Sequence, residues 1–285
     1  MSRLGERAEV VDLRELGPAV RYIPTKQAEA GLEAAVSSRD RRWLSLTGSG
    51  DFHHVTAPIL RQISEPISLV VFDYHSDWIK SSPCPCGAWM VSALGLPNIE
   101  RIVSIGMGGS SIENWLVGHG PAANIFSGRV EFYPYDCKMS KCLGRRTGDP
   151  ACAEIKRRLI STEIHWNTID GSDWDSMIRR IIDSLPTEKV YLSIDKDCLR
   201  AEHAVSNWQP GHLTLDQVIG AVGMLIESRD VIGADITGEY SKIEVANRMF
   251  EKLAVGIHPK NPPPSPGDLV RNEETNLALV EAMGF

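Results

Sequence analysis

The sequence predicts an α/β protein whose central sheet is mostly parallel and covered by helices on both faces. Short runs rich in β-branched and aromatic residues alternate along the chain with longer stretches that carry apolar residues at helical spacing. Two expected strands, at 68–72 and 190–194, are almost continuously apolar, which is typical of strands buried on both faces. Strands of this kind that alternate with helices indicate a sheet between helical layers.

The expected elements follow from these two periodicities. Eight short apolar runs are predicted to be strands: 10–13, 43–47, 69–74, 102–105, 130–133, 163–168, 190–194 and 231–236. Six longer stretches are predicted to be helices: 25–36, 55–63, 173–185, 215–228, 243–253 and 273–283. The proline-rich stretch 258–267 is expected to form a surface loop before the last helix. No repeat or long linker interrupts the chain, so residues 1–285 are expected to form one domain.

Composition narrows the class of function. The chain has 285 residues, of which 42% are hydrophobic and 24% charged, and its formal net charge is −7. This acidic balance without a long basic run argues against a nucleic-acid partner. No apolar run approaches the roughly 18 residues that cross a bilayer, so we expect a cytoplasmic protein with no membrane partner. The six cysteines are spread through a long chain without a secretion signal, which favours reduced thiols over a disulfide framework. The paired Cys-x2-Cys spacing of a structural zinc site is absent.

Polar side chains follow three predicted strands at the point where each strand ends. These clusters are Gly48-Ser-Gly-Asp-Phe-His-His54, Asp73-Tyr-His-Ser-Asp77 and Asp195-Lys-Asp197. Because ligands gather at the carboxyl ends of parallel strands, we expect the three clusters to face one cavity. Asp and His at strand ends also form isolated turns and caps, but three such clusters favour a shared site.

The residue types in these clusters indicate a metal centre. Carboxylates mixed with imidazoles suit Mn, Zn, Ni, Fe or Co, and four carboxylates with two histidines are enough for two ions. Four carboxylates about 4 Å apart would repel by roughly 4 kcal/mol per pair at an effective dielectric near 20. Two divalent cations remove this repulsion and leave room for a bound hydroxide.

The three clusters resemble motifs of the ureohydrolase family, which includes arginases, agmatinases, guanidinobutyrases and formiminoglutamases. Asp73-Tyr-His-Ser-Asp77 resembles the family's Asp-Ala-His-x-Asp, and Ser193-Ile-Asp-Lys-Asp197 resembles its Ser-x-Asp-x-Asp. His53-His-Val-Thr-Ala-Pro-Ile-Leu-Arg61 is similar to the agmatinase stretch His-Ser-Val-Thr-Leu-Pro-Ile-Leu-Arg, which selects His53 rather than His54. Phe52 is an extra residue within the family's Gly-Gly-Asp-His. The matches span residues 46 to about 240.

The resemblance implies an arginase-like three-layer α/β/α sandwich and two divalent ions, usually manganese. The implied ligands are His53, Asp73, His75, Asp77, Asp195 and Asp197. Among these, Asp73 and Asp195 would bridge both ions. His53 and Asp77 would complete the shell of one ion, and His75 and Asp197 that of the other. Family members commonly form trimers or hexamers, so the resemblance also implies a homo-oligomer.

These ions imply hydrolysis of a carbon–nitrogen bond other than a peptide bond, in a small molecule. Metal binding lowers the pKa of water toward about 7, and the hydroxide can attack a guanidinium, ureido or formimino carbon. A carboxylate outside the metal shell should hold a guanidinium. Gly233-Ala-Asp-Ile-Thr-Gly-Glu239 resembles the family's Gly-x-Asp-x-x-Glu with one extra residue, so Glu239 is the candidate. The catalytic set implied is Glu239 with Asp73 and Asp195.

Two departures from the family pattern bear on the substrate. Where arginases and agmatinases carry a His-Gly that transfers protons, the comparable place here is Cys86-Gly87. Cys86 is a packing residue, a ligand or a general acid, and His54, His203 and His212 are alternative proton carriers. An Asn that holds arginine's α-amino acid end is not seen after Asp77, where Trp78-Ile79 follow. We therefore expect an apolar entrance and poor activity on free arginine.

Two alternatives remain open at this point. One is a single-zinc deacetylase of amides or acylated amines on the same fold, which would hold one metal per chain. The other is a non-catalytic module that binds a nucleotide at 106–111, although this glycine-rich stretch departs from the dinucleotide fingerprint at its sixth position. If it binds no nucleotide, it is expected to form a loop near the active-site mouth.

Overall fold

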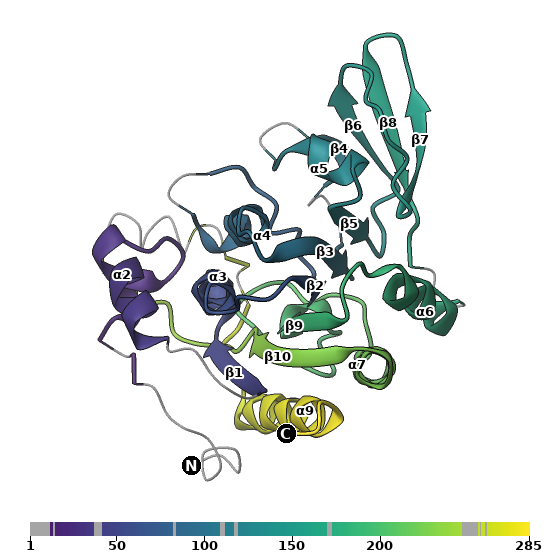
Figure 1. The fold of residues 1–285 in the computed structure, drawn as a ribbon. Helices are drawn as coiled ribbons and strands as arrows, with labels where there is room; N and C mark the ends of the chain where they lie inside the picture. Colours follow the sequence, from purple (N-terminus) through teal and green to yellow (C-terminus); the bar gives the residue numbers. More distant parts are fainter. Residues whose placement is uncertain are drawn as a thin grey trace.

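A six-stranded parallel sheet forms the centre of the molecule, with strand order β1-β10-β9-β2-β3-β5 (Figure 1). Its strands are β1 (Trp43–Gly48), β2 (Ile67–Phe72), β3 (Ile99–Ile105), β5 (Val130–Tyr133), β9 (Lys189–Asp195) and β10 (Asp230–Thr237). The computed structural model describes residues 12–13, 15–36, 42–81, 84–108, 112–116, 119–169, 173–246, 256, 258–259 and 261–285.

The register of the central strands brings their carboxyl ends to one edge. Every residue of β2 is buried, and β2 lies between β3 and β9, where Phe72 is level with both Ile105 and Ile194. Thr237 at the end of β10 pairs with Asp195, which ends β9. The segments that leave β1, β2 and β9 therefore start from the same edge, as the strand-end clusters predicted.

Helices cover both faces of this sheet, so the fold is a three-layer α/β/α sandwich (Figure 1). On one face lie α2 (Lys26–Ala35), α3 (Thr56–Leu60) and α4 (Trp89–Leu94), and on the other lie α6 (Trp174–Ser184), α7 (Leu215–Ser228) and α9 (Pro266–Ala282). Two further helices are short, α1 (Gly17–Val20) and α5 (Ala122–Phe126). Among those residues, no helix is both long and apolar enough to span a membrane.

A second, four-stranded sheet projects from the main body (Figure 1). It comprises β4 (Asn114–Trp115), β6 (Met139–Leu143), β7 (Ala153–Arg157) and β8 (Ser161–Trp166), in the order β4-β6-β8-β7. The strand predicted at 163–168 belongs to this sheet and pairs antiparallel with both neighbours. Buried and partly exposed residues alternate along β8, as in a sheet with one covered face. We call residues 138–166 the arm.

Most other predicted elements are present, with small shifts at their ends. The last helix begins at Pro266 rather than at 273, because Ser265 and Asp268 form a capping box ahead of it. Residues 12–13 of the strand predicted at 10–13 are irregular, and residues 10–11 lie outside the described residues. The helix predicted at 243–253 is absent over 243–246, and its remainder lies outside the described residues. All six cysteines are free thiols, as predicted.

Candidate metal centre

The structure gathers five of the six predicted ligands into two groups that share one carboxylate. Their nitrogen and oxygen ligand atoms lie within 4.8 Å of one another in each group. The groups are His53 with Asp73 and Asp195, and Asp73 with His75 and Asp197. Asp77, the sixth residue, reaches the first group because its Oδ2 lies 3.2 Å from His53 Nδ1. The common member is Asp73.

His53 faces the first group through Nδ1. This nitrogen lies 3.2 Å from Asp73 Oδ2 and 3.6 Å from Asp195 Oδ2. Its other ring nitrogen, Nε2, lies 2.9 Å from Ser193 Oγ, and the Ser193 hydroxyl donates to Asp235 Oδ1 at 2.7 Å. Since the serine proton is committed to Asp235, its oxygen accepts from His53 Nε2–H, which leaves Nδ1 as a lone-pair donor toward the carboxylates.

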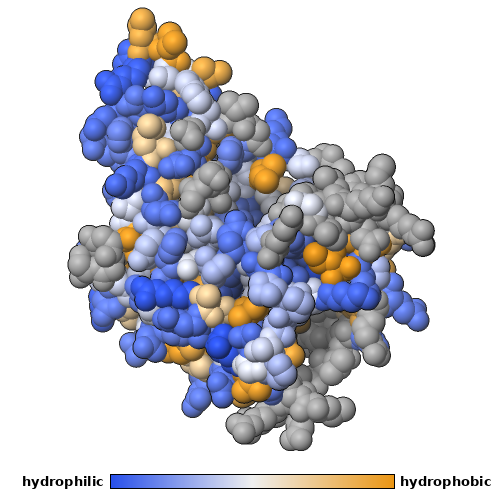
Figure 2. Space-filling view, turned by 180° about the vertical axis from the view of Figure 1, so that it is seen from behind, coloured by the Kyte–Doolittle hydropathy of each residue, from blue (hydrophilic) through white to orange (hydrophobic). Residues whose placement is uncertain are grey.

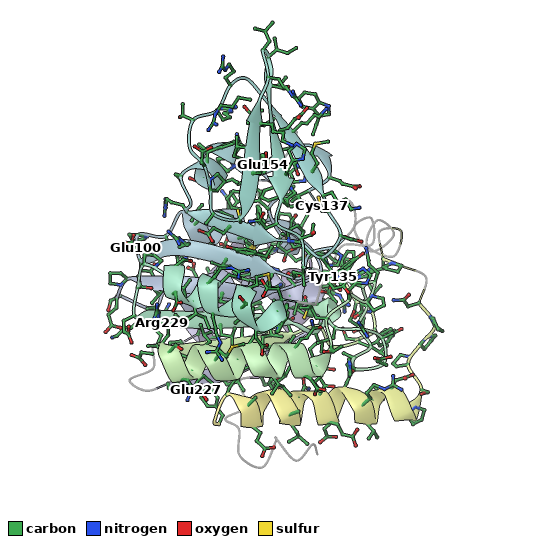
Figure 3. The ribbon with its side chains drawn as sticks, turned by 90° about the vertical axis from the view of Figure 1, so that its right-hand side faces the viewer. Glu100, Tyr135, Cys137, Glu154, Glu227 and Arg229 are labelled. Carbon is green, nitrogen blue, oxygen red and sulfur yellow. The ribbon has the colours of Figure 1, made fainter. Side chains whose placement is uncertain are left out.

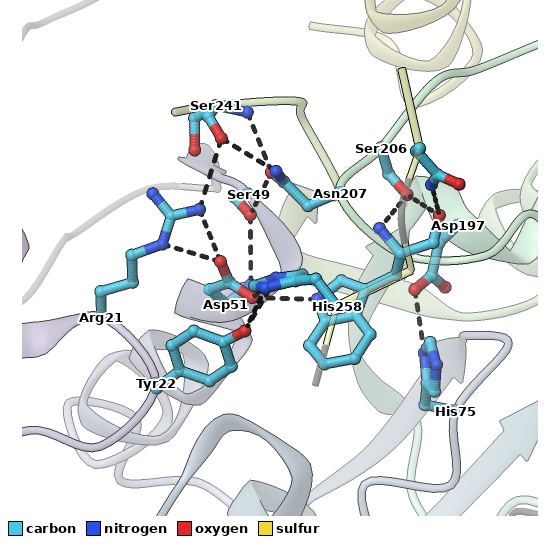
Figure 4. A network of polar contacts seen from close by, with 12 residues as sticks. Arg21, Tyr22, Ser49, Asp51, His75, Asp197, Ser206, Asn207, Ser241 and His258 are labelled. Carbon is cyan, nitrogen blue, oxygen red and sulfur yellow. Dashed lines mark hydrogen bonds and ion pairs between the residues drawn. The ribbon is translucent and has the colours of Figure 1, made fainter. Parts of the chain in front are cut away.

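His75 and Asp197 form the second group with Asp73. His75 Nδ1 lies 2.9 Å from Asp197 Oδ2 (Figure 4). The same nitrogen lies 3.7 Å from Asp73 Oδ1. Backbone N–H groups orient the carboxylates: His75 donates to Asp73 Oδ1, Tyr74 to Asp197 Oδ1, and Asp197 to Asp195 Oδ1. The second carboxylate oxygen of each of these three aspartates therefore accepts no hydrogen bond from these backbone N–H groups.

Buried polar atoms at the centre of the cluster contact one another as ion pairs but make no well-directed hydrogen bond. They include His53 Nδ1, Asp73 Oδ2 and Asp197 Oδ2. Unpaired buried polar groups cost about 1–3 kcal/mol each, so native structures seldom keep several together without a ligand. The orphaned atoms are one imidazole nitrogen and carboxylate oxygens, the donor set that divalent first-row metals accept. The residues present therefore fit a metal centre.

The pKa values of the cluster in the metal-free protein also indicate a metal centre. Burial, together with the neighbouring carboxylates Asp77 and Asp197, raises the pKa of Asp73 to about 7. Burial and the neighbouring carboxylates Asp197 and Asp73 also raise the pKa of Asp195 well above its ordinary value. Burial alone would lower the pKa of His75, but Asp197 and Asp73 outweigh it and raise that pKa to about 10. Without cations, protons hold this cluster of like charges together.

Two tryptophans that flank the second motif have different places. Trp89 Nε1 donates to Asp77 Oδ2 at 2.7 Å, and the Trp89 ring lies 4.6 Å from that of His53. Asp77 itself has a φ of 41°, a left-handed conformation that is rare for a residue other than glycine. Trp78 is fully buried in the core against Phe132, so the apolar entrance predicted from Trp78 is not formed by this residue. No feature of the sequence indicated that Trp89 contacts a ligand.

Glu239 lies just beyond the end of β10, outside both ligand groups. Its carboxylate pairs with the ammonium group of Lys196, which is fully buried. Asn272 and Asn276 of α9 also donate to it, at 3.1 and 2.6 Å. The preceding Gly238 has a φ of 89°, and a Cβ there would lie 2.4 Å from Asp195 Oδ1. The extra residue of this motif thus brings the backbone against Asp195 while the Glu239 side chain contacts Lys196 and α9.

The predicted proton carriers are spread around the cluster. Cys86 is partly buried, and its pKa is raised well above the ordinary value by burial and by Asp77. Burial lowers the pKa of His54 to about 4. His212 stacks on Tyr135 with ring centroids 4.6 Å apart, and His203 lies 3.6 Å from Glu202. None of the four belongs to either ligand group.

A buried network that sequence analysis did not identify adjoins the second group. Asp51 Oδ2 accepts from Arg21 Nε at 2.7 Å (Figure 4), and Asp51 Oδ1 accepts from Trp208 Nε1 at 2.9 Å. His258 Nε2 lies 3.0 Å from the same Oδ1, and the Trp208 ring lies 5.3 Å from that of His75. His258 is buried, contrary to the expected surface loop. A single histidine in a proline-rich stretch gave no signal of this contact.

The glycine-rich stretch 106–111 is described only over 106–108. A Cβ at Gly108 would lie 1.9 Å from the Tyr74 ring, and Gly108 N donates to the Tyr74 carbonyl at 3.0 Å. This part of the loop therefore packs on the second metal motif. Residues 109–111, on which the nucleotide alternative also depends, lie outside the described residues.

The fold and the paired ligand groups together define an α/β protein with a candidate metal centre at the carboxyl edge of its parallel sheet. The sequence profile of the Arginase family matches residues 3–255, and the chain belongs to this family. An uncharacterized protein of Thermotoga maritima is 25% identical over 243 residues, which cover 85% of this chain and 68% of that relative.

Solved structures share the fold at lower identity. The agmatine ureohydrolase of Thermoplasma volcanium superposes with a TM-score of 0.54 at 17% identity, over 97% of this chain and 71% of that chain. The formimidoylglutamase of Bacillus subtilis gives a TM-score of 0.54 at 16% identity, over 90% of this chain and 64% of that chain. The present chain thus spans under two thirds of the formimidoylglutamase. At these identities the likeness concerns the arginase-like fold.

Proposed function

We propose that the protein is a dinuclear metal-dependent hydrolase that acts on a guanidino, ureido or formimino carbon of a small molecule and releases urea or a related product. The observation that supports it best is the carboxylate of Asp73, which belongs to both ligand groups and has an orphaned buried oxygen. Mn²⁺ is the proposed metal, and Zn²⁺, Ni²⁺, Fe²⁺ or Co²⁺ are compatible with the same donors. From the family resemblance we also propose a single domain, a cytoplasmic location and a trimeric or hexameric assembly.

The proposed roles of the residues follow from their contacts. His53, Asp73, His75, Asp77, Asp195 and Asp197 would hold two ions, and the ions would supply a nucleophile near neutral pH by lowering the pKa of water. Ser193 and Asp235 keep His53 Nδ1 directed at the carboxylates. Trp89 fixes one oxygen of Asp77. The chain thus fixes ligand orientation before substrate arrives, which limits the reorganisation needed during the reaction.

Glu239 is the proposed carboxylate for a guanidinium group, and Glu239→Gln tests it. Loss of a charge-assisted hydrogen bond of about 1.5–3 kcal/mol should lower kcat/KM for a guanidinium substrate by roughly ten- to a hundredfold with metal content unchanged. Steady-state kinetics with metal analysis would measure this. If Glu239 only fastens Lys196 to α9, the variant will instead show normal kinetics and a lower melting temperature.

Free arginine should be a poor substrate. This expectation rests on the missing Asn after Asp77, because Trp78 is buried and lines no entrance. Urea or ammonia release should be measured over a panel of guanidino, ureido and formimino compounds, each at equal concentration. Urea release from arginine as fast as from the best compound of the panel would contradict the expectation.

Metal quantification on protein purified without chelator tests the proposed function against its alternatives. Two ions per chain and activity lost on chelation would support the hydrolase. One zinc per chain with activity on acylated amines would favour the deacetylase. Nucleotide binding that survives chelation, without hydrolysis, would favour the binding module.

A further inference from the structure

Exposed hydrophobic side chains gather at two places on the surface. Nine large hydrophobic side chains are exposed among the described residues, and six of them lie either on the arm or on α9 and the C-terminal residue beyond it. On the arm, Leu143, Leu159 and Ile160 are 63%, 88% and 74% exposed. On α9, Leu269 and Val270 are 52% and 55% exposed. Clustered exposed aliphatic groups mark interaction surfaces, whereas scattered ones need no explanation.

The three arm residues form one patch at the end of the projecting sheet. Leu143 pairs with Ser161 across β6 and β8, and Gly144 N donates to the Ile160 carbonyl at 2.9 Å. Leu159 and Ile160 occupy the turn between β7 and β8. Figure 2 shows hydrophobic atoms at the end of the arm, above a largely hydrophilic surface. We call Leu143, Leu159 and Ile160 the arm tip.

The two places carry opposite charge. The arm has seven Lys or Arg side chains against three Asp or Glu, in a chain whose net charge is −7. Residues 265–285 have four acidic side chains against one basic. On α9, Val270, Glu274 and Glu281 are exposed and fall on one helix face by their spacing. We call Leu269, Val270, Glu274 and Glu281 the α9 face.

The arm tip and the α9 face lie at opposite ends of the molecule (Figures 1 and 3). One copy therefore cannot bring its own two surfaces together. Contact between two arm tips would place basic arms against each other. The free edge of β7 is also a poor surface for strand pairing, because Arg157 bonds to the carbonyls of Arg146 and Gly148 and to Asp149 alongside it.

We propose that the arm tip of one copy docks on the α9 face of a second copy. Leu159 and Ile160 would pack on Leu269 and Val270, while basic side chains of the arm approach the acidic side chains of α9. A contact between different surfaces is head-to-tail, so repeated docking produces a closed ring or a filament according to the rotation per copy. The contact lies away from the metal-ligand groups and is independent of the proposed chemistry.

Sedimentation velocity on the full-length protein over a range of concentrations tests the proposal. The double change Leu159→Ser and Ile160→Ser removes the most exposed apolar groups and should raise the dissociation constant at least about tenfold. Leu46→Ser is the matched control, because Leu46 is 48% exposed on β1, outside both surfaces, and its self-association should equal that of the unchanged protein. A chain that stays monomeric at every concentration would overturn the proposal.

Charge exchange identifies the partner surface. Arg145→Glu with Arg146→Glu should weaken self-association, and Glu274→Arg with Glu281→Arg should weaken it similarly. A mixture of the two variant proteins should associate again, because each supplies the sign that the other lost. Failure of the mixture to associate would remove α9 as the partner. Binding of the arm to phosphatidylserine vesicles, lost in the Leu159 and Ile160 variant while self-association persists, would assign the arm tip to a membrane and overturn the proposal.

Discussion

Replacing Asp73 by alanine should empty both halves of the metal centre. Asp73 is the only residue common to the two ligand groups of the described chain, and its Oδ2 faces His53 while its Oδ1 lies on the side of His75. Removing it takes one donor from each proposed ion. We expect less than a tenth of the metal content of the unchanged protein after gel filtration, and activity lower by about a thousandfold or more.

Elemental analysis of matched variants separates this effect from unfolding. Asp195→Ala should also lose both ions if Asp195 bridges them, although the structure groups it only with His53 and Asp73. One ion retained in Asp195→Ala would remove Asp195 from the bridge and leave Asp73 in it. Asp216→Ala, at an exposed position in the first turn of α7, is the control and should keep its metals. Full occupancy in Asp73→Ala would contradict the two-metal assignment.

The melting temperature of the metal-free protein tests independently whether Asp73 is a metal ligand. Asp73→Asn keeps the side-chain shape and removes a carboxylate whose pKa burial and its neighbours raise to about 7. At pH 8 this carboxylate is ionised at a cost to the metal-free fold, so the variant should melt at a higher temperature than the unchanged protein without metal. With metal added, the order should reverse. A damaged fold would lower the melting temperature in both states.

The position of the site could be predicted from the sequence because each of its motifs is a short run of neighbouring residues. Each motif directly follows a strand, and parallel strands bring their carboxyl ends together, so the residues that leave β1, β2 and β9 had to meet. Asp235 and Ser193 were within the quoted motifs, and they are paired in the register of β10 and β9. The hydrogen bonds by which they orient the His53 ring could not be predicted, because these bonds depend on which strands are neighbours and not on the residue spacing within either strand.

Features that depend on distant segments were missed or misplaced. Nothing in the sequence around Glu239 indicates its contacts with Asn272 and Asn276, because these residues lie on the distant helix α9. Their side-chain amides donate to the Glu239 carboxylate. Trp78 follows a metal motif, but only the packing of Phe132 against it decides that it is core. The separate sheet of the arm was not predicted, because β8 was recognised as a strand from its residue types alone. Its alternating pattern, in contrast to the continuous apolar run of β2, is the signal that could have separated the two sheets.

Metal affinity should rise steeply with pH. Ligation requires neutral imidazoles and ionised carboxylates, but in the metal-free protein the pKa of His75 is raised to about 10 and that of Asp73 to about 7. The pKa of His53 is also raised well above its ordinary value. Between pH 7 and 9 His75 therefore releases a proton when metal binds, and the raised pKa of His53 adds to this proton release. Each proton released makes the dissociation constant about tenfold smaller per pH unit.

The stability of the metal-free fold should change with pH in the opposite direction. Asp73 holds its proton in the folded chain up to about pH 7 but loses it near 4 when unfolded, so this group makes the fold less stable as pH rises through that window. The contribution of His75 is complete below its unfolded pKa of 6.5 and is lost as pH rises toward 10. Both groups bind more protons in the folded chain than in the unfolded chain, whereas metal binding is strengthened when these protons are lost.

The gap between the melting temperatures of Mn²⁺-loaded and metal-free protein should therefore widen from pH 6 to pH 9. The reason is that the protons that stabilise the metal-free fold compete with the metal. Scanning calorimetry can measure this gap. A gap that does not depend on pH would mean that the buried cluster releases no protons on binding, and His53 and His75 would then not be the ligands.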